Sequence, residues 1–433
     1  MKRNKIAATM AIVVASALAL SGCSASNSSD EAQTITYWTW FPPEATLEAA
    51  VAAFENENPN INVELRTFEG PDYQKQLPLA LSGGEEIDVA GVQISAMTNT
   101  VKDYLLPVKD WAGDWLGNIN TTMIDQSKAI ATDGELYAVP MGSIGSPIMY
   151  YNAEMLNNLG IEVPTTGAEW KAAVEKISAS DPGITPVVFS GDGWWQEEML
   201  FGIAEQKSPG LSDDIIGGDG SWDQKGLVDG LKAYKSLFDD GIVGSDVLSL
   251  AGSRANEIFV AGDAAFYIDG SWNNSLLSES YRKDNSIGLT DVGAAPLPVI
   301  DGGSPSVRAL AEGGLAIPAA SKHVEAATKF IEFMVSTAGA NVWAKDLVLV
   351  PSLNGYELPD GILTSAAAKE GFASASKVIG SPTSKRDSQQ DFLNQVEGNT
   401  ILDVLRGTVT PEQAAATLQS EWNSGRYPHG SSK

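Results

Sequence analysis

Apolar and polar positions in the first third of the chain follow two different periods. Residues 34–38 (TITYW) alternate in twos, which predicts a strand with one buried face. Residues 46–60 (TLEAAVAAFENENPN) instead place their apolar side chains on one face of a helix. Asn58-Pro59 ends that helix, because proline cannot continue it and restrains the residue before it.

The same succession then repeats. Residues 61–68 (INVELRTF) alternate again, Tyr73 to Leu81 predicts a second helix closed by Ser82-Gly83-Gly84, and residues 87–93 (IDVAGVQ) read as a buried strand. Strands separated by helices imply mostly parallel sheets with right-handed crossovers. The fold class is therefore α/β.

Beyond Asp103 the chain keeps this alternation but adds segments rich in Gly and Ser. Residues 137–152 hold two short apolar runs around a Gly/Ser/Pro-rich middle, and residues 257–274 read as a helix end and a strand that delivers Trp272 to a loop. Residues 313–336 predict a strand, a break at Pro318 and a helix. The last hundred residues look helical and acidic.

The amino terminus has the layout of an export signal. The basic start MKRNK precedes the apolar stretch IAATMAIVVASALAL, which is short for a membrane span. Leu20-Ser21-Gly22-Cys23 resembles the bacterial lipobox, in which the cysteine is lipidated, and Cys23 is the only cysteine of the chain. We expect a signal peptide over 1–22, then lipidated Cys23 and a polar, flexible tether to residue 33.

Composition narrows the function classes. At 433 residues the chain is long enough for two packed domains. Its formal charge of −27 falls to −30 when Lys2, Arg3 and Lys5 leave with the signal, so nucleic acid and anionic lipid are disfavoured partners. Contact with the membrane is then expected through the lipid anchor only.

The count of reactive residues also argues against several chemistries. One cysteine allows no disulfide and no thiol metal site in the folded part. The two histidines, His323 and His429, lie outside any pocket-like motif. The chain has no Gly-rich phosphate loop with its lysine, so ATP hydrolysis would belong to a partner. We assign no catalytic residue, no metal and no cofactor.

The order of several segments carries a resemblance to a known family. These segments are ITYWTW with AAFENENPNINVEL; YQKQLPLALSGGEEIDV; LYAVPMGSIGSPIMYYNAEMLNNLGIEVPTTGAEW; FVAGDAAFYIDGSWNN; and GGLAIPAASKHVEAATKFIEFMVS followed by LVLVPS. Together they resemble the family-1 extracellular solute-binding proteins, the maltose-binding-protein-like receptors of sugar-importing ABC transporters. The likeness spans residues 34 to about 355.

The resemblance implies a periplasmic-binding-protein-like fold of type II, with two lobes and a ligand cleft between them. One lobe would hold residues 34–143 and 310–340, and the other 144–309 and 341–433. Three chain crossings would form the hinge, and we expect them near Met141 to Ser146, Ala309 to Ala316 and Val335 to Asn341. It further implies a monomer on the outer face of the membrane that delivers its sugar to permease subunits with a cytoplasmic ATPase.

A sugar site needs flat aromatic platforms for the C–H face of the ring. By family position Trp272 matches a residue that stacks on the sugar, one of Trp194 and Trp195 matches a second, and Trp40 matches the loop after the first strand. Phe41 follows Trp40 in that loop. Trp38 reads as core.

Polar ligand contacts are expected at strand ends and in the loops beside them. A carboxylate can accept hydrogen bonds from two sugar hydroxyls. The candidate polar residues are Gln93, Glu69, Asp72, Asp269, Asp192, Arg308 and the backbone of Gly314.

Two other functions stay open at this point. Polyamine receptors share the architecture and enclose a cation between aromatic rings and carboxylates, which would suit the acidic chain. An exported glycoside hydrolase would also line a cleft with tryptophans, and would need two opposed carboxylates.

Overall fold

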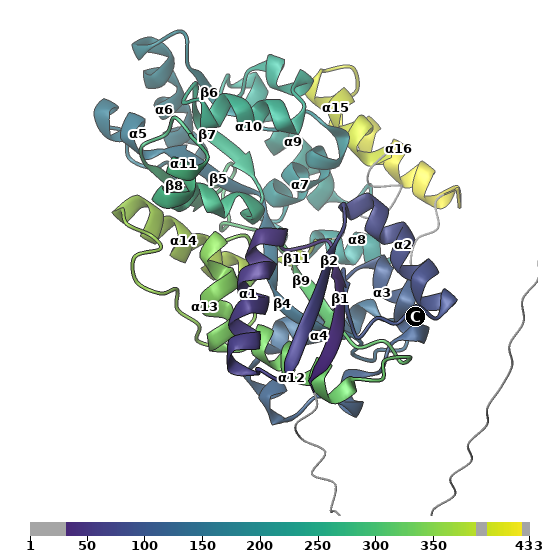
Figure 1. The fold of residues 1–433 in the computed structure, drawn as a ribbon. Coiled ribbons are helices and arrows are strands. Elements are labelled where there is room, and N and C mark those ends of the chain that lie inside the picture. Colours follow the sequence, from purple (N-terminus) through teal and green to yellow (C-terminus); the bar gives the residue numbers. More distant parts are fainter. Residues whose placement is uncertain (1–31, 387–395, 427–433) are drawn as a thin grey trace, which may run out of the picture.

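The computed structural model describes residues 32–386 and 396–426, and these form two lobes with a sheet each (Figure 1). The expected signal peptide and Cys23 lie outside the described residues. The two-lobed α/β architecture expected from the sequence is confirmed.

The larger sheet has the order β10-β4-β9-β3-β1-β2, and β11 also pairs with β9. Strands β1, β2 and β3 are parallel, whereas β9 runs antiparallel to β3 and β4. Strands β3 and β11 both pair with β9, at opposite ends of it. The strands are β1 (Gln33–Thr39), β2 (Ile61–Thr67), β3 (Val89–Val92), β4 (Val139–Ser146), β9 (Arg308–Ala316), β10 (Val350–Pro351) and β11 (Ser384–Lys385).

The smaller sheet has the order β6-β7-β5-β8. Only β6 and β7 are parallel, and β5 is antiparallel to both of its neighbours. Both sheets are therefore mixed rather than mostly parallel, because the strands next to the lobe crossings run against the others. The strands are β5 (Ile148–Asn152), β6 (Thr185–Val188), β7 (Ala264–Asp269) and β8 (Val292–Pro296).

Helices cover both sheets (Figure 1). Those on the larger sheet are α1 (Glu44–Glu57), α2 (Gly70–Gly83), α3 (Ala96–Val101), α4 (Thr121–Ile130), α12 (Val324–Met334) and α13 (Thr337–Trp343). Those of the smaller lobe are α5 (Ala153–Leu159), α6 (Gly167–Ser180), α7 (Gly193–Ala204), α8 (Leu211–Gly217), α9 (Lys225–Asp239), α10 (Gly252–Val260), α11 (Glu279–Asp284), α14 (Ala366–Ile379), α15 (Gly398–Leu405) and α16 (Pro411–Asn423).

The pattern of apolar residues in each element reflects which of its faces other elements cover. In β5 every residue is buried, with Ile148 and Tyr150 in the core under α10 and α14, and Met149 and Tyr151 in the core under α6 and α7. A strand covered on both faces loses the apolar–polar alternation and reads as a continuous apolar run. Helix α1 ends before Asn58, as its sequence predicts.

Between β4 and α14 the chain crosses between the lobes at three places, and two of them differ from the expected positions. The first lies at Pro147, between β4 and β5, directly after the expected segment. Strand β9 belongs wholly to the larger sheet, so the second crossing lies between Pro296 and Arg308, before the expected Ala309–Ala316. Helix α13 packs on α1 and β10 pairs with β4, so the third crossing lies between Pro351 and Ala366. After α14 the chain returns to the larger sheet at β11, before α15 of the smaller lobe.

Among the described residues, no helix combines the length and the apolar character that crossing a membrane requires.

Helix α7 packs directly on the first crossing, and this contact can be tested. A Cβ added at Gly202 would lie 2.4 Å from Cδ of Pro147. We expect Gly202→Ala to lower the free energy of unfolding by about 1–3 kcal/mol, because the overlap outweighs the better helix propensity of alanine. Thermal and urea unfolding measure this. Gly217→Ala on α8, where nothing lies within 4 Å, is the control; equal stability of both variants would contradict the close contact.

Candidate functional site

The loop that carries Trp272 is attached to both sides of the first crossing. It forms a short 3-10 helix (Ser271–Leu277) directly after β7. The Tyr150 hydroxyl, on β5, donates to the carbonyl of Gly270 at 3.0 Å. The backbone N–H of Gly145, on β4, donates to the Ser271 hydroxyl at 3.0 Å. Trp272 is thereby held where the two lobes meet.

The orientation of Trp272 depends on a glycine. A Cβ added at Gly270 would lie 2.2 Å from two carbons of the Trp272 ring, so only glycine lets the indole fold back over the loop. In this position Trp272 is half-buried and packs against the hydrophobic cores of both lobes. It is therefore a side chain through which the two lobes contact each other.

Trp194 and Trp195 lie in the first turn of α7 and extend the aromatic cluster. The Trp195 ring meets Trp272 edge to face, with centroids 6.3 Å apart and planes at 80°. It meets Trp194 in the same manner at 5.4 Å and 74°. Trp195 is fully buried and Trp194 half-buried. In this structure Trp195 therefore supports the cluster from behind, and Trp194 and Trp272 keep exposed surface.

Trp40 and Phe41 lie at the carboxyl end of β1, in the larger lobe. Trp40 is half-buried and stacks on Tyr73 of α2, with centroids 5.2 Å apart and planes at 28°. Phe41 is half-buried against the core of that lobe. Trp38, the residue expected in the core, is buried.

Gln93 follows β3, at the same edge of the sheet as Trp40. Its side-chain oxygen accepts a hydrogen bond from Gln74 of α2 at 3.2 Å. Its side chain also hydrogen-bonds Glu312 of β9, a buried carboxyl that the sequence reading had not singled out. The backbone N–H of Gly313 donates to Glu312 as well, at 2.9 Å.

Arg386 joins the polar and aromatic groups across the lobes. It follows β11, and its Cζ lies 4.9 Å from the centroid of the Trp272 ring. Its Nε lies 2.7 Å from a carboxylate oxygen of Glu198 on α7 and 3.2 Å from the Ser146 hydroxyl on β4. Its charge also acts on Glu312. Gln93 thus contacts Glu312, and Arg386, whose charge acts on Glu312, contacts Trp272.

Arg308 lies in a different place from the one expected. Its guanidinium is fully buried, forms an ion pair with Glu197 and lies 3.6 Å from Glu198. Gly314 lies near the end of β9, paired on both sides, with Val92 of β3 and Pro140 of β4 as its neighbours. In this structure neither residue is presented to a ligand, because the charge of Arg308 is neutralised internally and the backbone of Gly314 lies within the sheet.

The other acidic candidates differ in the lobe to which they belong and in their exposure to solvent. Glu69 and Asp72 are exposed at the start of α2. Asp192 is exposed before α7, where it accepts from Ser190 at 2.9 Å. Asp269 accepts from the Tyr267 hydroxyl and, at 2.8 Å, from the backbone of Gly270, so it holds the Trp272 loop. Burial raises the pKa of Asp269 to about 6.

Carboxyl groups outnumber guanidinium groups in the buried network behind the tryptophans. Glu397, next to α15, is fully buried, and neither of its carboxyl oxygens has a hydrogen-bond partner. Burial, together with the nearby Glu197 and Glu198 charges, raises the pKa of Glu397 well above its usual range. Arg308 and Arg386 bring only two positive charges to these three carboxyls and to the buried Glu205. We assign the surplus proton to Glu397, because no hydrogen-bond donor among the described residues stabilises its ionised form.

Sequence reasoning missed Glu312 and Arg386 for different reasons. Glu312 could have been recognised from the sequence, since it is the one acid in the apolar segment RALAEGGLA. Burying a charge in a strand costs free energy unless partners compensate for it, so such a residue is a candidate for a specific role. Arg386 had none, because the segment SPTSKRDSQQ has the composition of a solvated loop.

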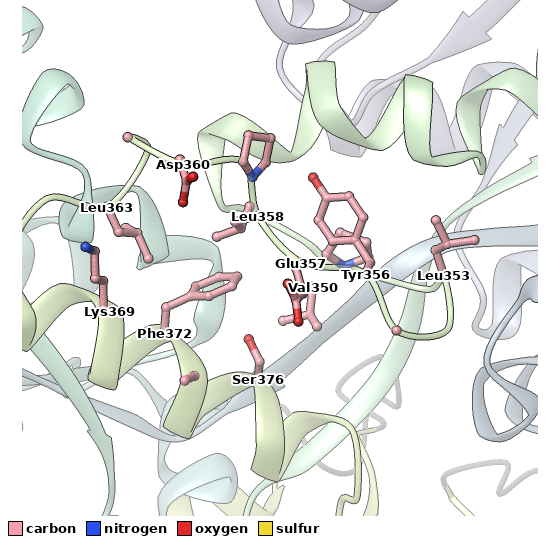
Figure 2. Close-up of a pocket in the computed structure, with 15 residues that line it drawn as sticks. Val350, Leu353, Tyr356, Glu357, Leu358, Asp360, Leu363, Lys369, Phe372 and Ser376 are labelled. Carbon is pink, nitrogen blue, oxygen red and sulfur yellow. The ribbon is translucent and has the colours of Figure 1, made fainter.

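A separate cavity of about 530 Å³ lies along the third crossing. Figure 2 shows Phe372 of α14 in its middle, with Leu363, Leu358 and Val350 around it. None of the residues that the sequence predicted for the ligand lines it. We therefore place the candidate site at the tryptophans, where side chains of both lobes converge.

Among the described residues, no group of three or more His, Cys, Asp or Glu side chains is arranged to hold a metal ion.

The comparisons with known proteins agree on one family. A model described as "Bacterial extracellular solute-binding protein" matches residues 39–341, more than half of the chain. The multiple sugar-binding protein of Streptococcus mutans is 24% identical over 357 residues, which cover 78% of this chain and 80% of that protein.

Solved structures share the fold at low sequence identity. The apo form of RafE from Streptococcus pneumoniae superposes with a TM-score of 0.71 at 17% identity, covering 92% of this chain and 98% of that one. The GacH receptor of Streptomyces glaucescens, whose structure was also solved with acarbose, gives 0.69 at 21% identity, covering 91% and 98%.

Because Glu397 carries the surplus proton, replacing Glu397 or Glu198 by glutamine should have different effects on stability. Glu397→Gln should leave stability unchanged or raised, because it replaces a neutral buried acid by a neutral amide. Glu198→Gln should lower the free energy of unfolding by about 3–5 kcal/mol, because Arg386 loses its buried partner. Equal losses for both variants would contradict the assignment of the proton.

The pH dependence follows from the same raised pKa. As pH rises above the usual glutamate value near 4.5, the unfolded chain loses a proton that native Glu397 keeps, so stability falls. In Glu397→Gln this fall should be shallower, which urea unfolding at a series of pH values measures.

Proposed function

The chain belongs to the family of bacterial extracellular solute-binding proteins, and we propose that it is the receptor of a sugar-importing ABC transporter. It binds a di- or oligosaccharide between its lobes and delivers it to permease subunits whose cytoplasmic ATPase supplies the energy. It acts as a monomer and performs no chemistry on the ligand.

The observation that carries this proposal is the position of Trp272. An indole that is half-buried, held by Gly270 and packed against both lobes has the flat apolar surface that the C–H face of a sugar requires. Trp194 next to it, and Trp40 in the larger lobe, are further platforms. Gln93, Glu69, Asp72 and Asp192 are the polar groups proposed to bind hydroxyls.

Closure of the lobes gives such a receptor its selectivity. A ligand stabilises the closed form only by as much as it binds that form better than the open one. A sugar that touches Trp272 and a side chain of the larger lobe at once makes contacts that exist only in the closed form. The names of the relatives support carbohydrate as the ligand class, since one is a multiple sugar-binding protein and another binds acarbose.

The proposal places the protein at the outer face of the cytoplasmic membrane. Lipid on Cys23 holds it there. The strongly acidic chain, with a formal charge of −27, would not adhere to anionic lipid unaided.

The aromatic platform can be tested by calorimetry. We expect at least one of maltose, raffinose, xylo-oligosaccharides and chito-oligosaccharides to bind, and Trp272→Ala to weaken that binding by about 2–4 kcal/mol, or about 30- to 1000-fold. Trp115→Ala, a half-buried indole elsewhere in the larger lobe, should leave affinity unchanged.

Three outcomes would redirect the proposal. Binding of spermidine without binding of any saccharide would favour a polyamine receptor. Cleavage of an oligosaccharide during incubation would favour a glycoside hydrolase. Unchanged affinity in folded Trp272→Ala would remove Trp272 from the site.

The anchor has its own test. Expressed in a bacterial host, the full-length protein should fractionate with membranes, and Cys23→Ala should be released into the soluble extracytoplasmic fraction, because the lipid is the only attachment proposed. Metabolic labelling with a fatty acid should mark the original chain and not the variant. Membrane retention of unlabelled Cys23→Ala would contradict lipidation as the attachment.

A further inference from the structure

A single carboxyl lies buried in the strand that forms the centre of the larger sheet. Glu312 is 4% exposed, and its neighbours along β9 are small or apolar (RALAEGGLA). Directly across on β4 lies Gly142, which brings no charge. Burying a carboxyl costs free energy unless hydrogen bonds compensate, so its surroundings indicate what it is used for.

The hydrogen bonds on Glu312 fix its direction. One carboxyl oxygen accepts from the backbone of Gly313 at 2.9 Å. Gln93 donates to the carboxyl from the carboxyl end of β3. The amide of Gln93 cannot turn freely, because its oxygen is already used by Gln74 at 3.2 Å. Glu312 is thus held in place by groups that leave acceptor capacity on its carboxyl oxygens.

The charged group that acts on Glu312 is Arg386, and it lies against the aromatic platform. Its guanidinium is 4.9 Å from the Trp272 centroid and is held by Glu198 and Ser146. Arg386 follows β11 of the larger sheet, whereas Trp272 and Glu198 belong to the smaller lobe. A guanidinium therefore lies over the indole at the boundary between the lobes, and its charge acts on the carboxyl of Glu312.

We propose that Glu312 is the specificity-determining acceptor of the ligand site, taking hydrogen bonds from adjacent hydroxyls of a neutral saccharide that stacks on Trp272. Arg386 donates to the oxygens of the same ring. The inference rests on the proposed function and adds to it: the receptor takes neutral sugars with vicinal hydroxyls and rejects uronic acids, because a second carboxylate would face Glu312.

The protonation of Glu312 makes this role measurable. Burial raises the pKa of the Glu312 carboxyl to about 7, against the opposing hydrogen bonds of Gly313 and Gln93 and the charge of Arg386. Hydroxyl donors favour the ionised carboxylate, so a bound sugar lowers that pKa again. Affinity must then fall as pH drops below about 7, and binding near pH 7 must release about half a proton.

The first experiment compares pH profiles of affinity for the tightest binder among maltose, raffinose, xylotriose and chitotriose. The original chain should lose up to about tenfold per pH unit between pH 7 and 5.5. Glu312→Gln should bind about 10- to 100-fold more weakly at pH 8 and show a flat profile from pH 8 down to about 6.5, below which Asp269 also titrates. Glu325→Gln, an exposed glutamate on α12, is the matched control and should behave like the original chain.

Two results would overturn the proposal. One is a Glu312→Gln protein, folded by thermal melting, with the affinity and pH profile of the original chain. The other is tight binding of trigalacturonate. Failure of every saccharide to bind the original chain would instead refute the proposed function itself, which separates the two failures.

A second measurement needs no variant. Calorimetry of the original chain in buffers with different ionisation enthalpies counts the protons released on binding. Asp269, with a pKa that burial raises to about 6, contributes mainly below pH 6.5, so the measurement is made at pH 7 to 7.5. Release of a substantial fraction of a proton supports the role of Glu312, and no release overturns it.

Discussion

The arrangement of the two lobes depends on buried charge pairs between α7 and the strands of the larger sheet. Arg308 and Arg386 come from β9 and the end of β11, and Glu197 and Glu198 from α7. Buried charges are strongly destabilising when unpaired, so these groups restrict α7 to one position beside the sheet. The first turn of α7 carries Trp194 and Trp195, and their position against Trp272 follows from that restriction.

The same network limits how the lobes can move. The Ser146 hydroxyl, at the end of β4, donates to Glu198 at 2.7 Å, and Gly202 of α7 packs against Pro147. The first crossing is therefore clamped to the smaller lobe. Rotation of one lobe against the other is easiest where charges stay paired, so it should pivot about α7, with Trp272 close to the axis and Trp40 further from it.

The sequence predicts the fold well where one face of an element is buried. Strand β1 and helix α1 follow their hydrophobic periods almost to the residue. Helix α7 was not predicted, because GWWQEEMLFGIA is buried nearly all round and has no polar face, while its two glutamates look like surface residues. The second crossing was misplaced because the resemblance put a hinge at Ala309–Ala316, where Gly314 instead allows β9 to pack closely on β3. Trp272 could be proposed from its place after a strand, whereas Arg386 enters the candidate site only through pairing with residues far away in the sequence.

In the cluster of three indoles, the buried ring supports the other two, which keep exposed surface. Trp195 is sealed in the core and meets both neighbours edge to face, which fixes the planes of their rings. Trp272 could not keep that plane with any other residue at position 270. A platform that is rigid before the ligand arrives loses little side-chain entropy on binding. The entropy cost then falls on the polar groups, and for Glu312 this cost is small because Gly313 and Gln93 already hold its carboxyl in place.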